Sequence, residues 1–230
     1  MREVLVFGLS ANPVHQGHVT LVCKALQALT ARGYEVAQTL IVPVYRRNPV
    51  GSGKPELAES YEQRVQLCER AVEEIHRCLK EARTEIQVSR IEKRLSKASG
   101  KPNYTAETLA ALREEVPDDM ELMFLMSSDL VGGEKPEFAR WHSIDKLTAL
   151  ATLVVCPRPG YPPNWDFLAT LKQRNARVVY LDEVETPAIS ATEIRERLAA
   201  GETPAALSAK GLLPPAVAAY LQQHPLDHLK

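Results

Sequence analysis

Cysteine and net charge are both scarce in this chain. Its 230 residues include four cysteines, spread through apolar segments without a Cys-x-x-Cys pair, which is typical of a reducing cytoplasm. The formal net charge is −1, so bulk electrostatics provide no attraction to nucleic acid or to an anionic membrane. We therefore expect a cytoplasmic protein whose partners are neither nucleic acids nor membranes.

Long apolar runs and repeats are missing too. Residues 1–20 have no charged start followed by a long apolar region, and the apolar stretch from Leu147 to Cys156 is too short to span a bilayer. The sequence has no internal repeat and no low-complexity segment. With 45% hydrophobic residues, the chain can bury a full core, and we expect one domain over residues 1–230 without an export signal or membrane anchor.

Short apolar runs alternate with amphipathic helical stretches along most of the chain. This alternation is typical of a parallel sheet wrapped by helices, so we predict an α/β fold with a doubly wound parallel sheet. The predicted strands cover residues 3–8, 38–44, 85–89, 121–127, 151–156 and 177–181, and the predicted helices cover residues 17–32, 60–82, 104–115, 140–148, 164–174, 190–199 and 214–223. Ser60 and Gln63 predict a capping box at the start of helix 60–82, which we interpret as scaffold. The tail after Gly201 predicts small helices packed on the same domain, so that residues from about 190 to 230 form a helical C-terminal part.

The N-terminal junction between the first strand and the first helix predicts a phosphate site. Residues 4–7 form a β-branched and aromatic strand, Gly8 begins a turn, and a helix follows from Gly17. His15 and His18 then lie at the first turn of that helix, where free N–H groups and the positive end of the helix dipole favour anions. Because they are three residues apart, both imidazoles share one face and can donate hydrogen bonds to one polyphosphate. Gly17 lets a ligand approach the backbone, and a zinc site is disfavoured because no cysteine or further histidine lies at ligand spacing nearby.

A second helix start, near the C-terminus, has similar chemistry. Ser190 and Glu193 predict a capping box, which gathers free N–H donors where an anion can use them. The same pattern also fits a helix cap without any ligand. Thr192 supplies a hydroxyl and Arg195 a forked guanidinium suited to phosphate, so we expect this turn to contact a triphosphate.

These two segments resemble known motifs. The stretch Gly8-Leu-Ser-Ala-Asn-Pro-Val-His-Gln-Gly-His18 resembles the His-x-Gly-His signature of the nucleotidylyltransferase superfamily, and Ile189-Ser-Ala-Thr-Glu-Ile-Arg195 resembles the Ile-Ser-Ser-Thr-x-Ile-Arg motif that closes the same active site. Members of this superfamily have a Rossmann-like fold and join a nucleoside monophosphate from a triphosphate to a phosphate-bearing acceptor. The resemblance implies catalytic roles for His15, His18 and Arg195. It assigns ATP contacts to Gly8, Ser10, Gly17, Asp129, Arg158, Ile189, Ser190 and Thr192.

Further motifs are similar to those of nicotinate-mononucleotide adenylyltransferases. The segment Lys101-Pro-Asn-Tyr-Thr-Ala-Glu-Thr-Leu109 resembles that family's Pro-Ser-Tyr-Thr-x-(Asp/Glu)-Thr-Leu, and Met126-Ser-Ser-Asp-Leu130 its Gly-Ala-Asp-Ser-Leu, whose acidic residue lies by the ribose and metal. The resemblance implies an acceptor pocket in which the indole of Trp141 stacks on the pyridine ring. The acceptor residues it assigns are Asn12, Tyr104, Thr105 and Trp141. Alternatively, Asn103 or Thr105 only caps the following helix, and Trp141 packs in the core.

The basic loop after the second predicted strand, residues 43–55, offers further phosphate ligands. Arg46, Arg47 and Lys54 would reach phosphates if this loop closes over them. The alternative is that the loop is only solvated, as exposed basic loops usually are. We keep Arg46 and Lys54 as the candidate phosphate contacts of this loop.

Together the motifs imply an adenylyltransferase of NAD biosynthesis. We expect it to transfer AMP from ATP to nicotinate or nicotinamide mononucleotide and to release pyrophosphate, with Mg²⁺ carried by ATP and no metal site of the protein's own. Leu9 and Ala11 replace a glycine and an aromatic residue of the family's first turn, and residues 129–141 form a longer segment, which leaves the acceptor open. The alternatives are a pantetheine-phosphate or flavin-mononucleotide adenylyltransferase, a nucleotide-binding sensor without turnover, and a purely structural domain. Homo-oligomer formation also stays open.

Overall fold

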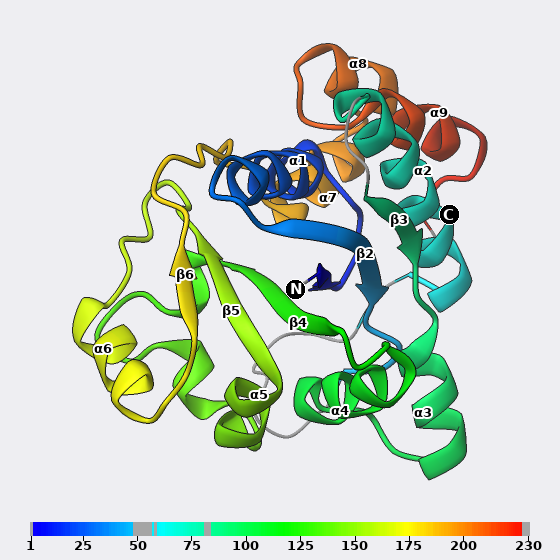
Figure 1. The fold of residues 1–230 in the computed structure, drawn as a ribbon. Coiled ribbons are helices and arrows are strands. Elements are labelled where there is room, and N and C mark those ends of the chain that lie inside the picture. Colours follow the sequence, from blue (N-terminus) through cyan, green and yellow to red (C-terminus); the bar gives the residue numbers. More distant parts are fainter. Residues whose placement is uncertain (1, 48–56, 58, 81–83, 227–230) are drawn as a thin grey trace.

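Six parallel strands form one sheet in the computed structural model, which describes residues 2–47, 57, 59–80 and 84–226. The strands lie in the order β3-β2-β1-β4-β5-β6 (Figure 1), and every neighbouring pair is parallel. Their bounds are β1 Arg2–Leu9, β2 Glu35–Pro43, β3 Glu85–Val88, β4 Met120–Ser127, β5 Ala151–Cys156 and β6 Val178–Tyr180. The predicted doubly wound parallel sheet is confirmed.

Helices cover both faces of the sheet because its strands are apolar on both faces. Along β1 the side chains alternate, so that Leu5 and Phe7 join one core while Val4 and Val6 join the other. The first core is covered by α1 (Gln16–Ala31), α2 (Tyr61–Cys78), α7 (Ala191–Ala199), α8 (Pro204–Ala209) and α9 (Pro215–Gln223), and the second by α3 (Ile91–Ser99), α4 (Thr105–Glu115), α5 (Ile144–Leu150) and α6 (Trp165–Gln173) (Figure 1).

The C-terminal helices α8 and α9 pack on the same core as the N-terminal half of the chain. Leu207 of α8 and Val217 and Leu221 of α9 are buried together with Leu29 of α1 and Leu67 of α2. This part is therefore a small helical extension of the sheet's first layer. Within the described residues, no helix is both long and apolar enough to cross a membrane.

Helix α3 is absent from the prediction, which left residues 90–103 without structure. Its sequence is rich in charge, and only Ile91, Glu92 and Ser96 are buried, so it has too few apolar positions for helical periodicity to be recognised. Gly100, at φ 73°, ends the helix in the left-handed region. The helix predicted at 140–148 begins later, at Ile144, because a short 3₁₀ turn, Glu137–Arg140, precedes it.

In each of the two predicted capping boxes, the hydrogen bond accepted by the serine hydroxyl forms. Ser60 Oγ accepts the Gln63 N–H at 3.2 Å, and Ser190 Oγ accepts the Glu193 N–H at 3.1 Å. The acidic and amide side chains have other partners: the Glu193 carboxylate accepts from Arg197 Nε at 3.0 Å, and the Gln63 amide donates to the carbonyls of residues 224 and 225. The caps thus start helices α2 and α7 as predicted, while the Glu193 side chain pairs within α7 and the Gln63 side chain links α2 to the segment after α9.

Candidate functional site

A cleft of about 680 Å³ opens at the carboxyl ends of β1 and β4. Strand order reverses there, because the chain runs outward from β1 to β2 and β3 and later returns to β4 on the other side of β1, and such a switch point is where open parallel sheets bind ligands. The cleft brings together segments from both ends of the chain. Its lining includes the predicted site residues Gly8, Ser10, Asn12, His15, Gly17, His18, Asp129, Trp141, Arg158, Ile189, Ser190, Thr192 and Arg195.

The two histidines form the start of α1. His15 is the N-cap residue in an extended conformation, and the His18 Nδ1 accepts the His15 backbone N–H at 3.1 Å. Their rings lie face to face, with centroids 3.7 Å apart and planes inclined by 30°. A Cβ atom at Gly17 would lie 3.0 Å from His15 Nδ1. A larger residue at this position would have to displace the His15 ring, so Gly17 makes room for that ring, and close approach of a ligand to Gly17 stays a prediction.

Both imidazoles are neutral near pH 7. Burial, the charge of His18 and the charge of Arg158 lower the pKa of His15 well below its usual value, and burial together with Arg158 lowers the pKa of His18 to about 4. Because the His18 Nδ1 accepts a hydrogen bond, the ring proton of neutral His18 lies on Nε2. His18 therefore offers a single N–H donor, and the positive charge of the cleft comes from its arginines.

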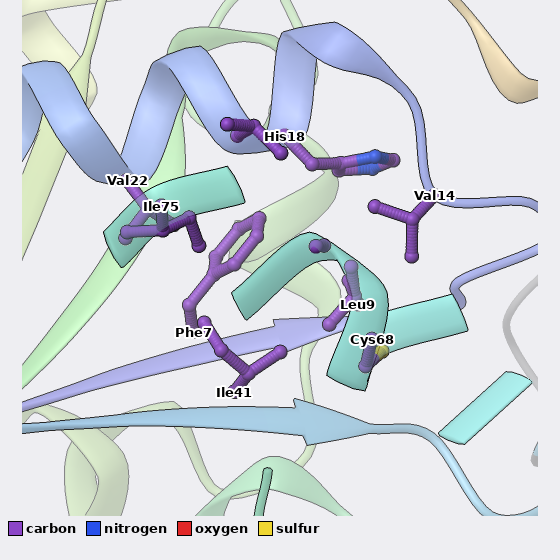
Figure 2. A pocket seen from close by; sticks show the side chains of 10 residues that line it. Phe7, Leu9, Val14, His18, Val22, Ile41, Cys68 and Ile75 are labelled. Atoms are coloured by element: carbon purple, nitrogen blue, oxygen red, sulfur yellow. The ribbon is translucent and has the colours of Figure 1, made fainter. Parts of the chain in front are cut away.

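A small apolar pocket lies behind His18, and Figure 2 shows the side chains that line it. A void of about 10 Å³ lies between the His18 ring, β1 and α2, with apolar side chains such as Phe7, Leu9 and Ile75 around it. A void of this size holds at most about one water molecule. The His18 ring therefore separates the open cleft from the apolar core, and this void is not a second ligand site.

Arg195 of α7 joins the C-terminal motif to the N-terminal one. Its Nη1 donates to the Asn12 carbonyl at 2.7 Å, and its Nη2 donates to Thr192 Oγ1 at 3.1 Å. The first of these bonds links residues 183 positions apart in the chain. The guanidinium thereby holds the start of α7 against the turn between β1 and α1, so that two helix N-termini face the same cleft.

An ion pair forms another part of the cleft lining. Arg158 Nη1 lies 2.8 Å from Asp129 Oδ2, and about a quarter of each side chain is exposed, 29% for Arg158 and 25% for Asp129. Ser127 Oγ donates to the other oxygen of Asp129, and Arg158 Nη2 donates to the Ile189 carbonyl at 3.4 Å. Asp129 is therefore held in place by its neighbours at the end of β4, and Arg158 presents its charge to the cleft from a fixed position.

Some predicted residues lie elsewhere. Of the described residues, Tyr104 and Thr105 stand outside the cleft lining: Tyr104 precedes α4 and stacks on His142, with centroids 4.1 Å apart, and Thr105 is the first residue of α4. Arg46 also lies outside the lining and covers the Tyr45 ring at 5.3 Å. Lys54 falls outside the residues that the structure describes.

The structure shows which residue caps α4 and where Trp141 lies. The N-cap of α4 is Tyr104, whose N–H is accepted by Glu107 at 2.9 Å, so neither Asn103 nor Thr105 is the cap. Trp141 lines the cleft and packs against Phe138, with centroids 5.1 Å apart. It is partly buried and therefore combines a packing contact with a position in the cleft lining.

Two arginines that the sequence did not single out donate hydrogen bonds to Ser10. Arg47, from the basic loop, lines the cleft and donates from Nη2 to Ser10 Oγ at 2.9 Å. Arg64 is buried in α2 and donates to the Ser10 carbonyl at 3.0 Å. The sequence contained one indication that Arg64 is buried, because it lies beside the apolar residues Val65 and Leu67 of a predicted helix.

Comparison with known proteins agrees with the geometry. The sequence profile of the cytidylyltransferase-like family matches residues 6–197. The probable nicotinate-nucleotide adenylyltransferase of Cronobacter sakazakii is 31% identical over 96% of this chain and 93% of that protein, and the nicotinate-nucleotide adenylyltransferase of Salmonella typhimurium is 32% identical over 96% of each. The nicotinic acid mononucleotide adenylyltransferase of Plasmodium falciparum, complexed with NaAD, has the same fold, with a TM-score of 0.74 at 15% identity over 100% of this chain and 99% of that chain. The chain belongs to the cytidylyltransferase-like family of nucleotidyltransferases, alongside the nicotinate-nucleotide adenylyltransferases.

Proposed function

We propose that this chain transfers AMP from ATP to nicotinate mononucleotide and releases pyrophosphate. The observation that carries the proposal is that His15, His18 and Arg195, from opposite ends of the sequence, line one cleft of about 680 Å³, a volume that suits nucleotide-sized ligands. Relatives that are 31% and 32% identical over nearly their whole length are named for this activity. The same cleft argues against a purely structural domain, which would not need two helix N-termini facing an open cavity.

The reaction needs no protein nucleophile. An oxygen of the acceptor's 5′-phosphate attacks the α-phosphorus of ATP in line, a new P–O bond forms, and the bond to the β-phosphate oxygen breaks so that pyrophosphate leaves with its electron pair. Negative charge grows on the leaving oxygens, where Arg195 and the Thr192 hydroxyl would stabilise it. His18 would donate its Nε2 proton in a hydrogen bond to the triphosphate without giving that proton up, because its imidazole is neutral.

Mg²⁺ would enter with ATP. Among the residues that the structure describes, no group of three or more His, Cys, Asp or Glu side chains could hold a metal ion, while Asp129 places one carboxylate on the cleft. This donor set fits Mg²⁺, which keeps several waters and binds one or two protein carboxylates together with substrate phosphates. Bound there, the ion would neutralise phosphate charge, and Asp129 would hold it at the nucleotide.

The choice of acceptor rests on the position of Trp141. Trp141 lies in the cleft, where an indole face suits a cationic pyridine ring, and nicotinamide mononucleotide is the second candidate because it has the same ring. Roles for Tyr104 and Thr105 in acceptor binding stay predictions. A cytoplasmic location belongs to the same proposal, since the free thiols of Cys23, Cys68, Cys78 and Cys156 suit a reducing compartment.

The test is a pyrophosphate release assay with ATP and Mg²⁺. The purified protein is incubated separately with nicotinate mononucleotide, nicotinamide mononucleotide, phosphopantetheine and flavin mononucleotide. We expect the highest kcat/KM with nicotinate mononucleotide and formation of its adenine dinucleotide. A preference for phosphopantetheine or flavin mononucleotide would overturn the acceptor assignment, and ATP binding without turnover on any acceptor would favour the sensor.

A further inference from the structure

We infer that Arg64 is a positioning residue for the nucleotide site: its buried guanidinium ties the turn after β1 to the segment after β2 that presents Arg47 to the cleft. The inference rests on the proposed function, since it assigns a purpose to the geometry of the phosphate site. Arg64 does not line the cleft, so it acts through the groups it holds.

The guanidinium of Arg64 is one of the most deeply buried groups of the protein. Arg64 lies in the first turn of α2 and is 1% exposed. Its Nη1 donates to the carbonyls of Ser10 at 3.0 Å and Val44 at 2.5 Å, its Nη2 to Tyr45 at 3.3 Å, and its Nε to Glu59 at 3.3 Å. Every hydrogen bond of this group found in the described part of the chain ends on a main-chain oxygen. The guanidinium therefore holds the backbone of these segments.

These carbonyls belong to two chain segments that separate just beyond the sheet. Leu9 pairs with Pro43 at the ends of β1 and β2, and the Val44 N–H donates to the Leu9 carbonyl at 2.9 Å. After this point one segment turns into Ser10 and the other continues toward Arg47. Because the planar guanidinium has a fixed geometry, bonds from it to both segments set the distance between them.

The two segments meet again on the cleft side. Arg47 Nη2 donates to Ser10 Oγ at 2.9 Å, so Ser10 is held at its carbonyl by Arg64 and at its hydroxyl by Arg47. Both Ser10 and Arg47 line the cleft. The segment after β2 is fixed from a further direction by Glu92, whose carboxylate accepts the Tyr45 N–H at 2.9 Å. The Glu92 carboxylate bonds to the segment after β2, whereas the buried Arg64 bonds to that segment and also to the turn after β1.

Burying a charged guanidinium costs free energy, and hydrogen bonds to its N–H groups offset only part of that cost. Burial disfavours the charged guanidinium and lowers its pKa, and carbonyl oxygens of three separate segments compensate it by accepting its N–H groups. A methionine or leucine at this position would fill the space but leave the carbonyls of Ser10, Val44 and Tyr45 without their donor. Precise placement of the phosphate ligands is the property that an apolar side chain would not supply.

The test compares Arg64→Lys with Arg70→Lys, a control further along α2 whose arginine pairs with Glu73 on the surface. Lysine keeps the charge but has no planar fork. We expect Arg64→Lys to weaken ATP binding by about 10- to 100-fold, measured by calorimetry without acceptor, to raise the KM for ATP, and to leave the KM of the acceptor within about twofold. Arg70→Lys should match the wild type. Equal loss of affinity for both substrates, or none, would overturn the inference.

A double-mutant cycle with Arg47→Met separates positioning from simple stabilisation. If Arg64 acts by placing Arg47 and Ser10, the double variant should bind ATP no more weakly than the worse of the two single variants. Additive losses would contradict the inference, and so would wild-type ATP affinity of an Arg64→Lys protein that keeps the far-UV circular dichroism of the wild type. Failure of the wild type to use nicotinate mononucleotide would overturn the proposed function and leave this comparison of ATP affinities intact.

Discussion

At the scale of single residues, the cleft combines neutral imidazoles with guanidinium groups. His15 and His18 stand at the start of α1 with lowered pKa values, whereas Arg47, Arg158 and Arg195 bring positive charge from three other segments. Neutral N–H donors favour a phosphate oxygen by direction, and guanidinium groups favour it by charge. The arrangement suits a reaction in which charge is redistributed along a triphosphate.

Replacing His18 tests the imidazole donor directly. His18→Ala removes the Nε2–H that would contact the triphosphate, and losing one such donor costs about 3 kcal/mol in the transition state. We therefore expect kcat for pyrophosphate release to fall by about 100-fold. His76→Ala, which removes an exposed imidazole of α2, should retain the wild-type rate. Turnover of a folded His18→Ala protein at that rate would show that the imidazole has no part in the reaction.

Gly17 tests how closely the His15 ring is held. In Gly17→Ala the new Cβ would lie 3.0 Å from His15 Nδ1 and 3.1 Å from its Cε1, so the ring must move. We expect kcat/KM to fall by more than about tenfold. The matched control is the same substitution in a His15→Ala protein, where the ring is gone and Gly17→Ala should cost nothing further. A second full loss in that background would show that Gly17 acts on the ligand instead.

At the scale of elements, the site is built by helix starts and strand ends rather than by any one motif. The N-termini of α1 and α7 face one cleft, and β1 and β4 deliver their last residues to its floor. Helix α2 contributes nothing to the lining, yet it holds the turn after β1 through Arg64 and the C-terminal segment through Gln63. It thus serves as the scaffold that the sequence predicted, with buried polar contacts that the sequence did not show.

Gln63 tests the docking of the C-terminal segment on α2. Its Nε2 donates to the carbonyls of His224 at 3.2 Å and Pro225 at 3.0 Å. Gln63→Leu removes both bonds, so we expect the free energy of unfolding in urea to fall by about 1–2 kcal/mol while ATP turnover stays near that of the wild type. Gln66→Leu, whose amide pairs with Glu69 one turn on, should cost less. Equal stability of the two variants would mean that the docking bonds do not contribute.

At the scale of the whole molecule, buried titratable groups make stability depend on pH in two opposing ways. The pKa values of His15 and His18 are lowered from 6.5, so the stability they contribute is present above pH 6.5 and is lost as the pH falls, for His18 as it falls through about 4. Burial raises the pKa of Glu92 from 4.5 to about 7. The protonated form of Glu92 is favoured in the folded state, so its contribution is present below pH 4.5 and is lost as the pH rises to 7.

Glu92→Gln separates these two effects. Glutamine can still accept the Tyr45 N–H but does not ionise. We expect the variant and the wild type to have similar free energies of unfolding at pH 4.5, and the variant to become more stable by up to about 3 kcal/mol above pH 7. Urea unfolding at pH 4.5, 6 and 8 measures the difference. A difference that stays constant over this range would mean that the carboxylate of Glu92 ionises as easily in the folded protein as in the unfolded chain.

The sequence by itself determined the sheet and the two phosphate-suited helix starts. Apolar alternation and the turn chemistry around residues 8–18 and 189–195 are local patterns, and backbone sterics and helix dipoles act over the same short distances. For that reason the strands, the histidine pair and the Ser190 cap were predicted closely. The charge-rich helix α3 was missed because it has too few apolar positions to show helical periodicity, and contacts such as Glu92 with Tyr45 join it to residues far away in the chain.

Only the tertiary structure decided which of these groups meet. It brought Arg195 to the Asn12 carbonyl and Arg47 to Ser10, and it buried Arg64 beneath both segments. It also placed Tyr104 against His142, outside the cleft lining, although the motif around it resembles an acceptor pocket. Such contacts depend on the strand order and on which face each helix covers, and these follow from the packing of the whole core, which no short stretch of sequence encodes.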